Sequence, residues 1–230
     1  MGGRVMQRTK IDWCTHTVNP VVGCTFGCSY CYARKMNDRF KWIEDWNKPI
    51  FSPERLQKLS SKKPKIIFMN SMSDIADWKQ EWKDEVFRTI KNNPQHVYLF
   101  LTKRLKEAYQ DIKYPSTVWL GNTITTQGDF IREYGRPSGA KRFYSIEPLL
   151  EPIRIPSNNI PRVNIQWVII GAETGNRKNK VIPKKEWITD IVKQSKRWDV
   201  PVFMKESLKE IMGDDFIQEF PCEIGGIINE

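Results

Sequence analysis

Three of the five cysteines fall within eight positions, in the stretch GCTFGCSYCYA at residues 23–33. Cys24, Cys28 and Cys31 are spaced so that one loop could hold three thiolates around a single ion or cluster, and Gly23 and Gly27 would let that loop curl tightly. Structural zinc sites and cysteine-bound iron–sulfur clusters usually take four protein ligands. The spacing therefore indicates a metal site that is one ligand short.

Two hypotheses account for the missing fourth ligand. Cys14 could complete a four-thiolate zinc or iron–sulfur site through a loop of about ten residues. Alternatively, three thiolates leave one iron of a cluster open to an exogenous ligand. Cys222 is single in its region, and His16 and His96 are the only histidines. We interpret His16 as structural and Cys222 as a buried or incidental thiol.

The composition is that of an ordinary globular protein, with 230 residues, 40% hydrophobic and 28% charged. No apolar run approaches the roughly 20 residues of a membrane span, and the N-terminus lacks the apolar core of a signal peptide. We therefore expect a cytoplasmic protein without a membrane partner. In that compartment thiols stay reduced, so a tight cysteine cluster is more typical of metal binding than of disulfides.

Lys and Arg exceed Asp and Glu by ten residues, which gives a formal charge of +10. This excess favours a polyanionic partner such as DNA, RNA or a nucleotide. The alternative is a generally basic surface that only aids solubility. The sequence does not indicate the oligomeric state.

Short apolar, β-branched or aromatic runs recur along the chain and are nearly continuous in hydrophobicity, as in strands of a parallel sheet buried on both faces. They are KIIFMN (65–70), HVYLFL (96–101), TVWLGN (117–122), KRFYSIE (141–147), QWVIIGAE (166–173) and VPVFMKE (200–206). NPVVG (19–23) is a further short candidate before the cysteines.

Helical patterns lie between most of these runs. In the segment 73–93, Trp78, Trp82, Val86 and Ile90 recur every four residues on one stripe. Shorter or similar patterns cover 53–59 and 184–198, and 151–162 reads as a Pro-rich loop. Repeated strand–helix units predict an α/β fold, a partial (β/α)6-type TIM-like barrel with parallel strands.

We expect one domain over 1–230, with its core at about 11–206 and a C-terminal tail at 207–230. Polar residues follow nearly every predicted strand, and the carboxyl ends of barrel strands meet at one face. The pattern favours a shared site at that face.

The C-x3-C-x2-C spacing, with Tyr30 just before the last cysteine, resembles the radical S-adenosylmethionine (SAM) superfamily. More narrowly, several stretches are similar to a phage-associated three-cysteine family of unknown function. They include IDWCTHTVNPVVGC, FMNSMSDIAD, FYSIEPLLEPI and WVIIGAETG, and the resemblance runs from about residue 11 to 206.

The resemblance implies a [4Fe–4S] cluster on Cys24, Cys28 and Cys31, whose open iron binds S-adenosyl-L-methionine. Reduction by a donor of the flavodoxin or ferredoxin type would split SAM into methionine and a 5′-deoxyadenosyl radical that abstracts a substrate hydrogen. The protein would supply orientation and exclude side reactions. The phage association and the basic charge together favour a nucleotide, or DNA or RNA in modification or repair.

The resemblance also implies SAM contacts at the strand ends. Asn70, Ser71, Ser73 and Asp74 offer acceptors for the SAM ammonium where the superfamily usually has a glycine-rich motif, although Ser73 or Asp74 could instead only cap the following helix. The remaining SAM candidates are Tyr30, Thr102, Lys103, Asn122, Ser145, Glu147 and Glu173, and the substrate candidates are Lys205 and Glu206.

Two other functions stay open beside the radical SAM enzyme. One is a nucleic-acid-binding module stabilised by zinc on Cys14 and the three clustered cysteines. The other is an iron–sulfur protein that has no SAM chemistry.

Overall fold

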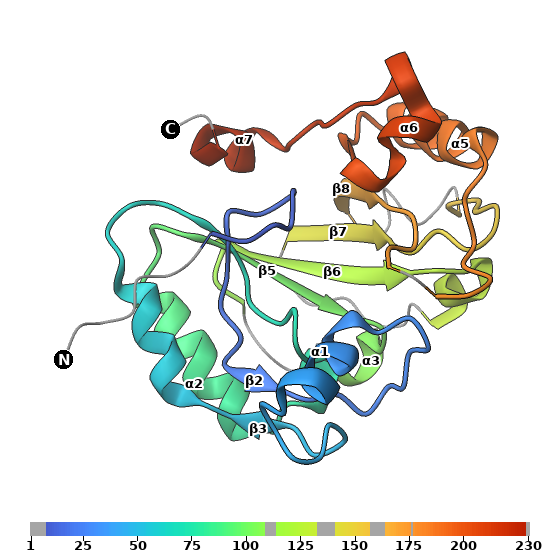
Figure 1. The fold of residues 1–230 in the computed structure, drawn as a ribbon. Coiled ribbons are helices and arrows are strands. Elements are labelled where there is room, and N and C mark those ends of the chain that lie inside the picture. The colour runs from blue at the N-terminus through green and yellow to red at the C-terminus, as the bar shows by residue number, and fades with distance from the viewer. Residues whose placement is uncertain (1–7, 109–113, 133–140, 157–163, 176, 229–230) are drawn as a thin grey trace.

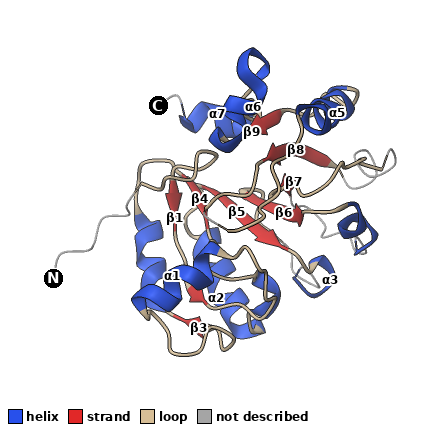
Figure 2. Cartoon of the chain, turned by 45° about the vertical axis from the view of Figure 1, so that its right-hand side comes forward, coloured by secondary structure: helices blue, strands red, loops and turns tan. Residues whose placement is uncertain are grey.

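Seven parallel strands form one curled sheet in the order β1-β4-β5-β6-β7-β8-β9, an open half-barrel (Figures 1 and 2). This computed structural model describes residues 8–108, 114–132, 141–156, 164–175 and 177–228. The strands are β1 (His16–Thr17), β4 (Ile66–Phe68), β5 (Val97–Thr102), β6 (Val118–Ile124), β7 (Lys141–Ile146), β8 (Ile165–Ile170) and β9 (Val202–Met204). The predicted partial parallel barrel is confirmed.

Helices lie between most of the parallel strands along the chain, as the connections between parallel neighbours need. They are α1 (Tyr32–Phe40), α2 (Gln80–Lys91), α3 (Leu105–Ala108), α5 (Lys185–Lys196), α6 (Lys209–Met212) and α7 (Cys222–Ile228). Short 3-10 helices are η1 (Pro53–Ser60), η2 (Ile75–Asp77), η3 (Gln127–Arg132), η4 (Glu206–Leu208) and η5 (Gly213–Asp215). In the described parts of the chain, no helix combines the length and apolar character needed to cross a membrane.

Alternate residues of each strand face opposite sides of the sheet. The outer side packs against α2 and α5; for example, Tyr98 and Phe100 belong to one core cluster with Val86 and Ile90 of α2. The inner side carries a second, mainly aromatic cluster that we call the inner core. Its members include Trp13, Phe68, Leu99, Trp119, Phe143, Trp167, Phe203 and Ile224.

The inner core contains three of the nine tryptophans, Trp13, Trp119 and Trp167. The Trp167 ring lies 5.9 to 6.5 Å from the rings of Trp13, Trp119, Phe143 and Phe203. Ile224 of α7 is completely buried against this face. The segment expected to be a tail therefore contributes to the core, although Cys222, at the start of α7, is exposed rather than buried.

The short strand predicted in NPVVG is present as β2 (Val21–Val22), but it pairs antiparallel with β3 (Ile50–Phe51) outside the main sheet. The polar strand β1 takes the edge position instead, and its two residues are too few and too polar for hydropathy to detect. The predicted helix 73–93 is interrupted, because Trp78 is extended between η2 and α2. Part of the predicted loop 151–162 lies outside the described residues.

Candidate functional site

The cysteine loop, residues 24–31, links β2 to α1 at the carboxyl end of β1. Gly23 has φ +112°, and a Cβ there would come within 2.9 Å of both Pro49 Cα and the Trp46 carbonyl oxygen. The Cys24 N–H donates to that same carbonyl at 2.9 Å. The first cysteine thus needs a glycine before it, because any side chain would collide with the segment that anchors the loop.

The three thiols are free and partly exposed. Cys31 is the N-cap of α1, where its Sγ accepts a hydrogen bond from Arg34 N at 3.4 Å. Cys24 and Cys31 also pack on a small core cluster that contains Trp46. Burial raises the pKa of Cys24 to about 12 and also raises the pKa of Cys28. Metal binding would have to release these protons, as thiolate ligation generally does.

Asp77 holds the loop to the main sheet. Its carboxylate accepts hydrogen bonds from Thr25 N at 2.9 Å and Thr25 Oγ1 at 2.7 Å, and from Arg104 Nη2 at 2.6 Å. Burial opposes ionisation of Asp77, but these donors outweigh it and lower its pKa. Asp77 and Arg104 were not predicted as site residues, and only their place after strands β4 and β5 hints at such a role.

Lys103 lies over the cysteine loop. Its Nζ is 5.3 Å from the centre of the Tyr30 ring and 5.9 Å from that of Phe26. Burial lowers the pKa of Lys103, while the nearby Cys28 sulfur works in the opposite direction. A positive charge at this position would favour thiolates on the loop.

Cys14 is not part of this group of thiols. It belongs to the inner core beside Trp13, and burial raises its pKa. In the described part of the chain, no three His, Cys, Asp or Glu side chains are gathered closely enough to hold one metal ion. A [4Fe–4S] cluster binds each thiolate through a different iron, so its ligands stand farther apart than those of a single ion.

A cavity of about 280 Å³ opens at the carboxyl ends of the strands, next to the cysteine loop. Seven of the predicted residues line it together: Tyr30, Asn70, Ser71, Ser145, Glu147, Glu173 and Lys205. Other residues that the sequence did not single out also line the cavity, among them Ile11, Trp13, Tyr32, Thr123 and Thr174. The predicted meeting of strand ends at one face is thus present.

Two ion pairs organise the rim of the cavity. Lys205 pairs with Glu147 across the ends of β9 and β7. Gly171 lies beneath this pair, since a Cβ there would come within 2.9 Å of Lys205 Cδ and 3.1 Å of Glu147 Cδ. Arg177 donates to both carboxylate oxygens of Glu173 at 2.5 and 2.6 Å, and these bonds lower the pKa of Glu173.

Several predicted SAM contacts are instead occupied within the protein. Asp74 is buried, caps η2 through Ala76 N and accepts from Thr102 Oγ1 at 2.6 Å, so the capping interpretation is confirmed for Asp74. Asn70 bonds the main chain of Leu101 through both its oxygen and its nitrogen. Ser73 accepts from the Trp78 indole.

Six predicted site residues are not among the described residues that line the cavity: Ser73, Asp74, Thr102, Lys103, Asn122 and Glu206. Asn122 and Thr102 occupy the outer register of their strands, and Thr123 lines the cavity instead. Glu206 is exposed and pairs with Lys209 at 3.6 Å.

Comparison with known proteins adds a relative and a family. The chain is 29% identical over 155 residues to the "Uncharacterized protein MJ0683" of Methanocaldococcus jannaschii, an alignment that covers 62% of this chain and 58% of that protein. No solved structure matches the chain. The model of the family described as "Protein of unknown function (DUF5131)" matches residues 8–212, and the chain therefore belongs to that family.

Proposed function

We propose that this protein is a radical SAM enzyme that holds a [4Fe–4S] cluster on Cys24, Cys28 and Cys31. The observation that carries the proposal is a juxtaposition. A loop with three free thiols at the superfamily spacing adjoins a cavity formed by the ends of parallel strands, and Tyr30 of the loop lines that cavity. Enzymes with this type of fold assemble their sites at the same end of the sheet.

The donor set suits such a cluster. The three thiols are partly exposed and lie on one short loop. The Lys103 ammonium acts on Cys28 and would offset part of the negative charge of bound thiolates. Bound there, the reduced cluster would supply the electron that cleaves SAM to methionine and a 5′-deoxyadenosyl radical for hydrogen abstraction. We further propose a small flavodoxin- or ferredoxin-type donor and a cytoplasmic location, where the thiols stay reduced.

The chain's own residues would bind and orient SAM. The cavity presents the Glu147 carboxylate, the Ser145 hydroxyl and the Lys205 ammonium. In that order, these groups are complementary to the ammonium, hydroxyl and carboxylate groups of an amino-acid nucleoside. Its volume, about 280 Å³, is slightly below the usual range for small-ligand sites, about 300–1,000 Å³. Trp13, Phe68 and Leu101 form its apolar wall and would limit access of water to the reacting bond.

Anaerobic reconstitution tests cluster binding directly. The wild-type protein should take up about four irons and a matching amount of sulfide per chain, and Cys28→Ser should lose most of both. Cys222→Ser is the matched control, because Cys222 is exposed and lies on α7, away from the loop. Stoichiometric zinc without sulfide in wild type would instead favour the zinc-stabilised module. A full cluster that never cleaves SAM would favour an iron–sulfur protein without SAM chemistry.

A further inference from the structure

A large groove lies beside the cavity, on the side of the N-terminal segment, α1 and η1. Its volume is about 1370 Å³, above the usual range of about 300–1,000 Å³ for small-molecule sites. Ile11, Tyr32 and Ser71 line both the groove and the cavity, so the two spaces adjoin. A groove of this size suits an extended ligand, part of which can reach the cavity.

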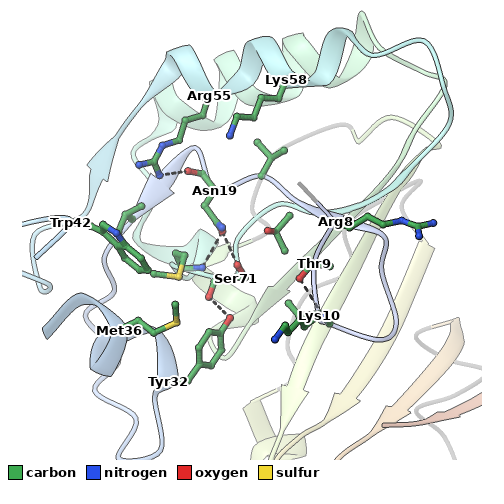
Figure 3. Close-up of a pocket in the computed structure, with 15 residues that line it drawn as sticks. Arg8, Thr9, Lys10, Asn19, Tyr32, Met36, Trp42, Arg55, Lys58 and Ser71 are labelled. Carbon is green, nitrogen blue, oxygen red and sulfur yellow. Dashed lines mark hydrogen bonds between the residues drawn. The ribbon is translucent and has the colours of Figure 1, made fainter. Parts of the chain in front are cut away.

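The groove is strongly basic. Arg8, Lys10, Arg55 and Lys58 line it, and none of the described residues that form its walls is Asp or Glu. Arg55 donates to the Asn19 carbonyl oxygen at 2.8 Å, a neutral acceptor that leaves its charge uncompensated in that contact. Figure 3 shows Arg55 and Lys58 on one wall of the groove and Lys10 on the opposite side, with Arg8 directed away from the centre. Cations that face each other across a groove favour a phosphate chain.

Exposed apolar side chains form the remaining wall. Tyr32 and Met36, four residues apart on α1, line the groove and are 51% and 38% exposed. Phe40, four residues further on, is 52% exposed but is not among the residues that line the groove. Trp42 is 47% exposed and stacks on Phe40, with ring centres 5.5 Å apart and planes at 18°. In Figure 3, Trp42 and Met36 stand on one side of the groove, and the Tyr32 ring lies between them and Lys10.

This combination of charges and rings favours an unpaired strand. Base faces stack on aromatic side chains only when the bases are not enclosed in a duplex. Enzymes that act on a base must also take it out of the stack. An acidic protein could contact the four cations, but it would give the aromatic wall no stacking partner.

We propose that the groove binds a single-stranded polynucleotide, with phosphates on Lys10, Arg55 and Lys58 and bases against Trp42 and Tyr32, and that one nucleotide is held where the groove meets the mouth of the cavity. The substrate class named here rests on the proposed function, because the cavity is the proposed SAM site. DNA and RNA share the phosphate and base chemistry, so both are arms of the test.

The test measures binding of labelled 12-residue oligo(dT) and oligo(rU) to the full, cluster-loaded protein, without reductant, over a range of salt concentrations. Each lost phosphate contact should reduce the salt slope by about 0.7, so the double variant Lys10→Gln/Lys58→Gln should reduce it by about 1.4. Trp42→Ala should weaken binding about 10- to 100-fold with little change in slope. Lys193→Gln/Lys196→Gln, exposed on α5, removes the same charge elsewhere and should change neither quantity.

Three results would overturn the inference: equal losses in the α5 control, equal affinity for a duplex of the same length, or equally strong competition by polyglutamate or inorganic polyphosphate of matched charge. The last would mean that the groove recognises charge alone or an acidic protein. Because binding is read without reductant, strand binding together with absent SAM cleavage would contradict the proposed enzyme and leave the binding site standing. SAM cleavage without strand binding would contradict the proposed binding site and leave the proposed enzyme standing.

Discussion

Asp77 accepts two hydrogen bonds from Thr25, one from its main-chain N–H at 2.9 Å and one from its hydroxyl at 2.7 Å. Thr25 directly follows Cys24, the first cysteine of the loop. Asp77 is the last residue of η2, which follows β4 in the chain. The same carboxylate also pairs with Arg104 after β5. One nearly buried aspartate therefore fixes the cysteine loop to two strand ends of the half-barrel.

Asp77→Asn should loosen the cysteine loop. The amide loses the charge that Arg104 pairs with and half of the acceptor capacity of the carboxylate. We expect the free energy of unfolding to fall by about 2 kcal/mol and cluster uptake per folded chain to decrease. Chemical denaturation and iron analysis measure these two quantities. Asp84→Asn, on the exposed side of α2, is the control and should leave both unchanged. Equal effects of the two substitutions would contradict the anchoring role of Asp77.

Cys14→Ala separates packing from ligation. Because Cys14 is 6% exposed within the inner core, removing its sulfur should cost about 1 kcal/mol in the free energy of unfolding. Lower stability alone therefore does not indicate a zinc ligand. The reconstituted variant should keep the wild-type ratio of iron and sulfide to folded protein. Loss of bound metal in Cys14→Ala, measured by elemental analysis, would support the four-cysteine site instead.

Gly121→Ala should destabilise the sheet beneath the cavity. A Cβ at Gly121 would come within 2.5 Å of Leu101 and closer still to the Phe143 ring. Overpacking of this kind costs about 1–3 kcal/mol, which thermal unfolding would show as a lower midpoint. Gly128→Ala is the matched control, since among the described residues its added Cβ has no neighbour nearer than Thr126 Oγ1 at 3.9 Å. A midpoint for Gly121→Ala equal to that of the control would contradict the close packing.

The Glu173–Arg177 pair predicts a pH dependence. Arg177 lowers the pKa of Glu173 in the folded protein below its ordinary value of 4.5. The unfolded chain therefore binds this proton more readily, and the pair's stabilisation is fully present above about pH 4.5 and lost as pH falls through the folded pKa. The difference in unfolding free energy between wild type and Glu173→Gln should shrink below that pH. A difference that stays constant with pH would contradict the pairing. Glu186→Gln, at an exposed position of α5, is the control, and its difference from wild type should not shrink in this way.

The sequence predicted the fold through its hydrophobic runs, because strands buried on both faces are apolar along their whole length. It failed where structure depends on contacts rather than hydropathy. The two-residue strand β1 is held by pairing with β4. The extended backbone of Trp78 interrupts a segment whose apolar residues have helical spacing. The groove was also missed, because its basic residues come from segments far apart in the chain.

For the site, the sequence identified the strand ends, but it did not identify which residues at those ends point to the inner side of the sheet. Counting by twos from Trp119 and Phe143 of the inner core selects Thr123 and Ser145, which line the cavity, and excludes Asn122. That signal was in the sequence once an inner face had been assigned. The internal partners of Asp74 and Asn70 had no such signal, since both depend on the precise approach of β4 to β5.

The most direct test of the account is the formation of 5′-deoxyadenosine by the anaerobically reconstituted, dithionite-reduced protein with SAM, followed by liquid chromatography. We expect 5′-deoxyadenosine and methionine from wild type and neither product from Cys28→Ser, with Cys222→Ser as active as wild type. A wild-type protein that carries a full complement of iron and sulfide, binds SAM, and yields no 5′-deoxyadenosine with or without oligonucleotide would contradict the proposed function.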